Sequence, residues 1–178
     1  MKNFCIIFLL SIIISVTALG FSYGGRVDKI NGEYLRIHIR ADSNDPTAQA
    51  VKYLVRDDVV AYLTPVVANC ESRLEAEEEI SRRLPELETV ATATLRKNGF
   101  SYGASARLTQ EKFPTRVYGE YTLPEGTYSA LVIELGSGAG NNWWCVVYPP
   151  LCFAAPSGQN VIYKSKIAQI IQNWKKNR

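Results

Sequence analysis

Apolar and polar residues alternate in several short segments, the pattern of strands that bury one face. Residues 33–40 begin the series, with Leu35, Ile37 and Ile39 on one face and polar residues such as His38 on the other. The period of two returns in residues 100–108, 115–123, 127–135 and 143–148. Short turns separate these later segments, so the pattern predicts one early strand followed by an antiparallel meander.

Between the first strand and the meander, apolar residues recur at spacings of three and four, which indicates helices. Asp45 is expected to cap a helix that starts at Pro46, and Pro65 should kink or end it. Ser72-Arg-Leu-Glu75 has the form of a capping box that opens a second helix, and Pro85 separates this helix from a third. We therefore predict an α+β fold, a mostly antiparallel sheet with two or three helices packed on one face.

The first twenty residues differ from the rest of the chain. A basic start is followed by an apolar run from Phe4 to Leu19, which falls short of the roughly 20 residues that span a bilayer. Ala18 and Gly20 offer the small residues that a signal peptidase reads. We expect a cleaved export signal, and an uncleaved membrane anchor is the alternative.

Composition and charge limit the class of protein. The chain has 178 residues, 47% hydrophobic and 21% charged, with a formal net charge of +3. These values are typical of a globular chain, and the small charge gives no reason to expect nucleic acid as a partner. We expect a signal or anchor at residues 1–20, a linker at 21–32, a globular α+β domain at 33–153, and a linker with an amphipathic helix at 154–178.

The C-terminal helix has two interpretations. Residues 161–178 combine an apolar stripe with several lysines. Such a helix either packs on its own domain and ends in a basic tail, or lies on an anionic membrane surface.

Export would allow disulfide bonds. Cys145 and Cys152 flank Pro149-Pro150 and are the plausible pair, which would leave Cys70 free or buried. The alternative is that all three cysteines are buried thiols.

The glycine-rich and aromatic stretch from Gly136 to Phe153 is the main candidate for a contact surface. Its glycine loop is expected to be mobile, and it is not a phosphate-binding loop because a strand rather than a helix follows it. Trp143 and Trp144 must point to opposite faces of that strand. Either one of them is exposed as a docking anchor, or protein covers both faces.

A catalytic site is hard to find in this sequence. His38 is the single histidine, and it could serve as the base for Cys145 or Cys152 in a thiol enzyme. The spacing of Cys145 and Cys152 is wider than that of structural zinc sites. We expect neither an enzyme nor a bound metal or cofactor, and keep the thiol enzyme as the alternative.

Several segments of the chain, taken in order, match the pattern of a known family. They are Leu35-Arg-Ile-His-Ile-Arg-Ala-Asp-Ser-Asn-Asp-Pro46, Val55-Arg56-Asp57, Phe113-Pro114, Leu123-Pro-Glu-Gly-Thr-Tyr-Ser-Ala-Leu131 and residues 136–152, of which 142–152 are the most specific part. With these segments, which run from about Leu35 to Phe153, the sequence resembles the stage II sporulation protein R family of endospore-forming bacteria.

The resemblance implies a signalling protein that is made in the forespore and exported into the space between the two membranes of the sporulating cell. There it would activate a membrane-bound aspartic protease through its outer domain, which leads to processing of the precursor of the mother-cell sigma factor sigma-E. Apart from the resemblance, contact with a membrane surface through an N-terminal anchor or the C-terminal helix stays the alternative interpretation of those two segments. The residues that we expect to contact or organise the partner surface are Trp143, Trp144, Asn142, Asn141, Gly140, Gly138, Arg56 and Asp57.

Overall fold

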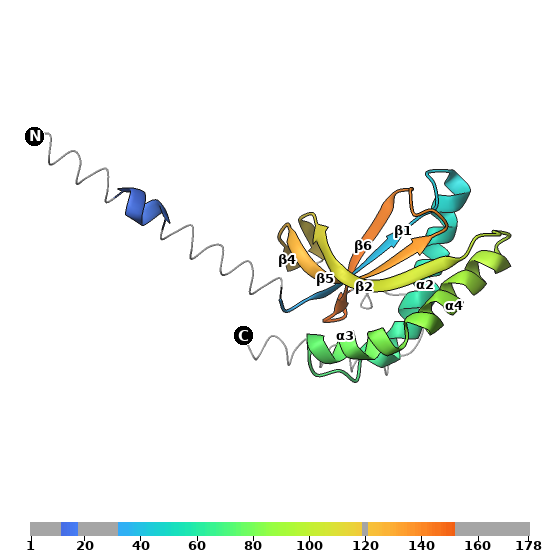
Figure 1. Cartoon of the computed structure of the whole chain (residues 1–178), viewed down its shortest axis with the longest axis horizontal. Coiled ribbons are helices and arrows are strands. Elements are labelled where there is room, and N and C mark those ends of the chain that lie inside the picture. The colour runs from blue at the N-terminus through green and yellow to red at the C-terminus, as the bar shows by residue number, and fades with distance from the viewer. Residues whose placement is uncertain (1–11, 18–31, 119–120, 152–178) are drawn as a thin grey trace, which may run out of the picture.

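The computed structural model describes residues 12–17, 32–118 and 121–151 (Figure 1). Its elements are β1 (Leu35–Arg40), α2 (Pro46–Val67), α3 (Arg73–Arg82), α4 (Leu84–Lys97), β2 (Ala104–Phe113), β3 (Arg116–Tyr118), β4 (Tyr121–Leu123), β5 (Gly126–Leu135) and β6 (Asn142–Tyr148). The expected C-terminal helix and most of the expected signal segment and linker lie outside the described residues. Among the helices described, none has both the length and the apolar character needed to span a bilayer.

The main sheet has four strands in the order β2-β5-β1-β6. β1 pairs in parallel with β5 and antiparallel with β6, while β2 pairs antiparallel with β5. The α+β class is confirmed, and two of the three pairings in this sheet are antiparallel, in line with the predicted mostly antiparallel sheet. The sheet is nevertheless mixed, because β1 and β5 pair in parallel, and the prediction of an uninterrupted meander is wrong. The early strand inserts between two strands of the expected meander, so the loop from β5 to β6 crosses the end of β1 and is no hairpin.

The helices follow the sequence signals with small differences. α2 runs through Pro65 and ends two residues later, at Val67. Asp45 occupies the N-cap position, but its side chain accepts a hydrogen bond from the Ser43 hydroxyl (2.9 Å) and caps no helix N–H. The Ser72 half of the capping box at α3 is confirmed, since Ser72 Oγ accepts a bond from the Glu75 N–H (3.2 Å). The Glu75 carboxylate accepts from the N–H of Glu71 (2.7 Å), one residue before the cap.

Two apolar clusters lie on opposite faces of the sheet. The larger one packs α2, α3 and α4 against Leu35, Ile37 and Ile39 of β1, so the described helices cover one face. The smaller one lies on the other face and includes Phe113 and Tyr128. The β3–β4 hairpin adds Leu123 to this second cluster.

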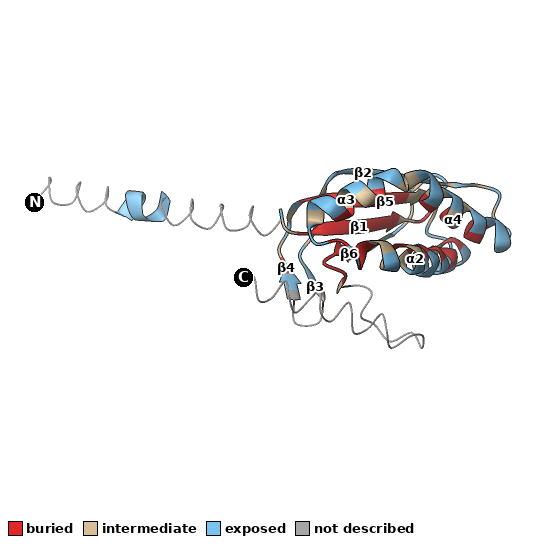
Figure 2. Ribbon diagram, turned by 90° about the horizontal axis from the view of Figure 1, so that it is seen from below, coloured by how far each residue is buried: buried red, intermediate tan, exposed pale blue. Residues whose placement is uncertain are grey.

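β1 is therefore buried on both faces (Figure 2). Arg36 is 0% exposed and His38 is 1% exposed. Their polarity suggested a solvated face of the strand, and that prediction is wrong. The reason is tertiary: the smaller cluster lies over these side chains, and the alternation of a single strand cannot show such a cover.

Candidate docking surface

The loop at residues 136–141 is fixed to the chain that follows β1. The Gly140 N–H donates to the Ala41 carbonyl (2.8 Å), and the Asn141 N–H donates to Asn44 Oδ1 (2.7 Å). The Ser137 N–H donates to Asp42 Oδ1 (2.7 Å). The expectation of a mobile loop is therefore wrong, because Ser137, Gly140 and Asn141 are all hydrogen-bonded to residues 41–44.

Two glycines are required by this close approach. A Cβ atom at Gly140 would lie 2.2 Å from the Ser43 carbonyl oxygen. Gly136 has a φ of +58°, and a Cβ there would lie 2.3 Å from Asp42 Oδ1. These glycines let the loop lie against the Asp42 side chain and the Ser43 backbone of the same chain, whereas Gly140 was expected to contact a partner. Gly138, with a φ of +64°, packs on the side chain of Glu134.

Lys52 of α2 also holds this loop, a role that no pattern in the sequence indicates. Its side chain is 1% exposed, and its Nζ donates to Gln49 Oε1 (2.8 Å) and to the Asn141 carbonyl (3.0 Å). Burial lowers the pKa of Lys52, since the charged form loses its hydration. A lysine at this helical position would ordinarily be assigned to the solvated side.

Trp143 lies on the helical face of the sheet, beside α2. The Arg56 guanidinium lies 5.6 Å from the centre of the Trp143 ring and 5.0 Å from that of Tyr53. Arg56 also pairs with Asp57 (2.7 Å). We call these four residues, Tyr53, Arg56, Asp57 and Trp143, the docking patch. Tyr53 is 44% exposed, so the patch offers aromatic area and both charge signs to solvent.

Trp144 lies on the opposite face of the same strand. Its ring stacks on His38 with centroids 3.6 Å apart, and it meets Phe113 edge-on at 4.6 Å. Asn142 is exposed at the start of β6, opposite Arg40. The expected contact residues are thus divided: Trp143 joins Arg56 and Asp57, while Trp144 belongs to the second cluster.

An ion-pair network surrounds His38 on that second face. Glu111 accepts from His38 Nδ1 (3.0 Å) and pairs with Arg40, which also pairs with Glu134 (2.9 Å). Arg107 donates to Glu134 (2.6 Å), and this hydrogen bond lowers the pKa of Glu134. The network joins β1, β2 and β5. The His38 ring is hydrogen-bonded through Nδ1 alone, since its Nε2 has no partner among the described residues.

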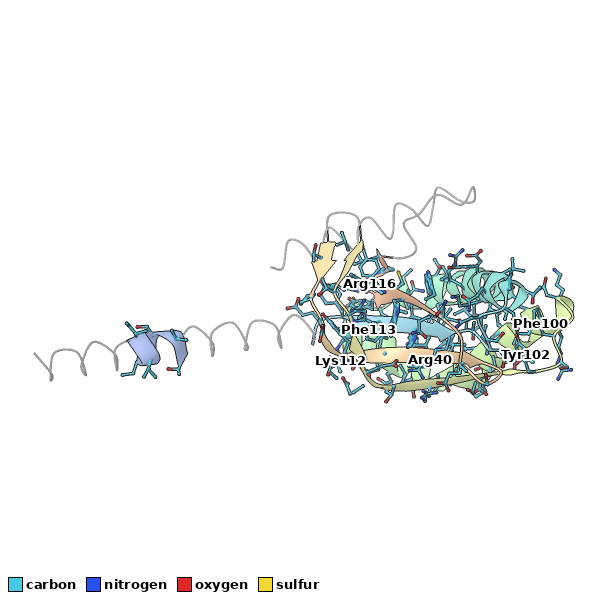
Figure 3. The ribbon with its side chains drawn as sticks, turned by 90° about the horizontal axis from the view of Figure 1, so that it is seen from above. Arg40, Phe100, Tyr102, Lys112, Phe113 and Arg116 are labelled. Atoms are coloured by element: carbon cyan, nitrogen blue, oxygen red, sulfur yellow. The ribbon has the colours of Figure 1, made fainter. Side chains whose placement is uncertain are left out.

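Arg36 is a second buried polar side chain on this face. Its Nη2 donates to the Tyr118 hydroxyl (2.8 Å), and its guanidinium lies 4.0 Å from the centre of the Phe113 ring. Burial lowers the pKa of Arg36. Figure 3 shows Phe113 beneath the hairpin that carries Arg116. Arg36 therefore ties the β3–β4 hairpin to the central strand.

A Cys145–His38 pair is wrong. Cys145 lies opposite Ile37 in the β1–β6 register and packs in the helical cluster, whereas His38 lies opposite Trp144 on the other face. Cys70 is a buried free thiol whose pKa burial raises to about 11, so it is a poor nucleophile near neutral pH. Cys152 lies outside the described residues, and the Cys145–Cys152 bridge stays a prediction. No group of three or more possible metal ligands occurs within the described part of the chain.

Comparison with known proteins places the chain among spore-formation proteins. A family model described as Stage II sporulation protein R matches residues 31–157. The Stage II sporulation protein R of Bacillus subtilis (strain 168) is 39% identical over 124 residues, which cover 70% of this chain and 55% of that protein. The chain thus spans about half the length of the curated relative that it matches. No solved structure matches the chain.

Proposed function

The chain belongs to the stage II sporulation protein R family and has a role in sporulation, and from this premise we propose that it is an exported signal for a membrane-bound aspartic protease. The signal acts from the space between the forespore and mother-cell membranes. It binds the outer domain of the protease, which then processes the precursor of sigma-E. A ligand activates in this way only if it binds the active state more tightly than the inactive one.

The observation that carries this proposal is the docking patch. Trp143 and Arg56 are residue types that dominate binding hot spots, and they lie against each other before any partner is bound. Arg56 and Trp143 are held by regular elements, α2 and β6, and the bond from Lys52 of α2 to the carbonyl of Asn141 fixes the residue just before β6. A pre-formed patch of this kind loses little conformational entropy on binding.

Export of the chain is part of the proposal. The apolar N-terminal segment supports it, and so does the pair of cysteines around Pro149-Pro150. In an oxidising space Cys145 and Cys152 would form a bridge at the end of β6, the strand that carries both tryptophans. No observation on the described residues favours the thiol enzyme, since His38 is buried and bonded to Glu111.

The test is precursor processing in cells that contain the protease and a Trp143→Ala variant of the chain. Processing is expected to fall by at least tenfold, in line with the loss of a hot-spot aromatic worth about 2 kcal/mol. Val117→Ala is the matched control, because Val117 is 66% exposed on the separate β3–β4 hairpin. Normal processing by a Trp143→Ala chain with a native circular dichroism spectrum would show that the patch is not the contact surface.

A further inference from the structure

β2 is an edge strand, and only the first half of its outer edge is covered. The Ala104 N–H donates to Thr92 Oγ1 (3.0 Å) and the Ala106 N–H to Glu88 Oε1 (2.8 Å), so side chains of α4 occupy these positions. Backbone groups of a strand alternate in direction, and the N–H groups of Leu108, Gln110 and Lys112 therefore point the same way. Within the described residues these three donors have no partner.

The open half of the edge borders a groove between α3 and β2. The groove has a volume of about 530 Å³, and Leu108 and Gln110 line it together with Glu77 and Glu78 of α3. Leu74, also in the lining, is 66% exposed. An exposed row of backbone donors and acceptors is a template for one more strand, and the groove would receive every second side chain of that strand.

We propose that the occupant is β2 of a second copy of this chain, paired antiparallel about a two-fold axis at Gln110. Gln110 then faces Gln110 of the partner subunit, and Leu108 faces Lys112 of the partner subunit. This register uses the three free N–H groups of each copy and none that is already bonded. The inference does not depend on the proposed function.

Neighbouring registers are poorer for reasons that the structure gives. A shift that centres the axis on Thr109 would place Ala106 opposite Lys112 of the partner subunit, but the Ala106 N–H is bonded to Glu88. A shift in the other direction would place Pro114 opposite Leu108, and proline has no N–H to donate. The segment with free N–H groups therefore lies between Ala106, whose N–H is already bonded, and Pro114, which has none. Two copies of this segment can pair with each other when Gln110 lies on the two-fold axis.

Charge favours the same arrangement. Lys112 is 75% exposed at the end of β2, away from Phe100 and Tyr102 (Figure 3), and its ammonium pairs with the exposed Glu125 of its own chain (2.8 Å). By the alternation of a strand, Lys112 lies on the same face as Leu108 and Gln110, which line the groove. Opposite Leu108 of the other copy, its ammonium comes beside the groove that Glu77 and Glu78 line. A single strand pair buries a small area, so the dimer is expected to be weak and to depend on concentration.

Sedimentation velocity on the full chain in a mild detergent, from about 1 µM to about 1 mM, tests the proposal. We expect a reversible monomer–dimer equilibrium. Gln110→Pro removes the central outward N–H, which is not part of the β2–β5 ladder, and should raise the dimer Kd at least tenfold. Gln110→Ala is the matched control, because it keeps the N–H and should dimerise with a similar Kd. A chain that stays monomeric throughout, or a folded Gln110→Pro variant that dimerises as well as the wild type, would refute the pairing.

Cross-linking tests the register. Cα atoms of a hydrogen-bonded antiparallel pair lie about 5.5 Å apart, within disulfide reach, so Gln110→Cys should oxidise to a covalent dimer. Thr109→Cys is the control, since Thr109 would face Glu111 of the partner subunit, and it should cross-link at least tenfold more slowly. Lys112→Glu should weaken the dimer, and adding Glu78→Lys should restore it. Faster cross-linking at Thr109 than at Gln110, or no restoration by the second charge change, would overturn the register.

Discussion

Gly140→Ala should displace the loop that precedes β6, although Gly140 is not a residue of the docking patch. The added methyl group would lie 2.2 Å from the carbonyl oxygen of Ser43, 2.5 Å from its carbonyl carbon and 3.0 Å from the Ala41 carbonyl oxygen. All three neighbours are backbone atoms, so no side-chain rotation can relieve the contact. The loop at residues 136–141 must move away from residues 41–44.

The expected cost follows from the hydrogen bonds that cross this approach. They join Gly140 to Ala41 (2.8 Å), Asn141 to Asn44 (2.7 Å) and Lys52 to the Asn141 carbonyl (3.0 Å). A neutral bond contributes about 1 kcal/mol, and a bond from a charged donor about 1.5–3 kcal/mol. Loss or lengthening of these bonds should lower the free energy of unfolding by about 2–4 kcal/mol.

Urea denaturation, monitored by tryptophan fluorescence, measures this change. Gly103→Ala is the matched control, because its added Cβ would lie 3.4 Å from Thr92 Oγ1 in ordinary contact. The control should unfold within about 0.5 kcal/mol of the wild type. If the free energy of unfolding of Gly140→Ala is also within about 0.5 kcal/mol of the wild type, the stability of the loop does not depend on this close approach.

Two further predictions concern buried titratable groups. Burial lowers the pKa of Lys52 in the folded chain below its ordinary value of 10.5. Between the folded and unfolded pKa values the unfolded chain binds more protons, so stability rises with pH. Lys52→Met should lose this rise when the free energy of unfolding is measured from about pH 8 to the ordinary pKa of 10.5, and an unchanged slope would contradict the prediction. The pKa of Cys70 is raised to about 11, so this thiol should react with Ellman's reagent at pH 8 about 100-fold more slowly than free cysteine. Rapid reaction of Cys70 in the folded chain, checked against Cys70→Ala, would show that the thiol is accessible and reactive.

The elements could be predicted from the sequence, but their neighbours could not. Alternation and capping signals indicate most of the strands and helices within about five residues, because these signals are local. The prediction of one strand at residues 115–123 is wrong, since this segment forms the β3–β4 hairpin. The parallel pairing of β1 with β5 joins segments such as Leu35 and Ser129, and no local pattern reports a contact so distant in sequence. A period of two tells which side chains share a face and leaves open which strands lie on either side.

In the candidate site, too, the sequence predicts local features but not contacts between distant segments. Trp143, Arg56 and Asp57 were proposed separately from residue type and position, and the structure brings them together beside α2. The separation of Trp144 from Trp143 follows from strand geometry, but its stacking on His38 does not. Arg36, His38 and Lys52 looked solvated because their polarity is a property of the residue, whereas their burial depends on what the rest of the chain places over them.

The central position of β1 has a consequence for the order in which the fold can form. A ribosome makes Leu35–Arg40 early, yet both neighbours of this strand, β5 and β6, come at residues 126–148. Until those residues are available, β1 can pair with neither, and the helical face of the protein has no complete sheet to pack on. Such non-local pairing slows folding. The nascent chain therefore stays unfinished until its last described strand emerges, and a product that stops before Asn142 would leave the middle strand with one edge open.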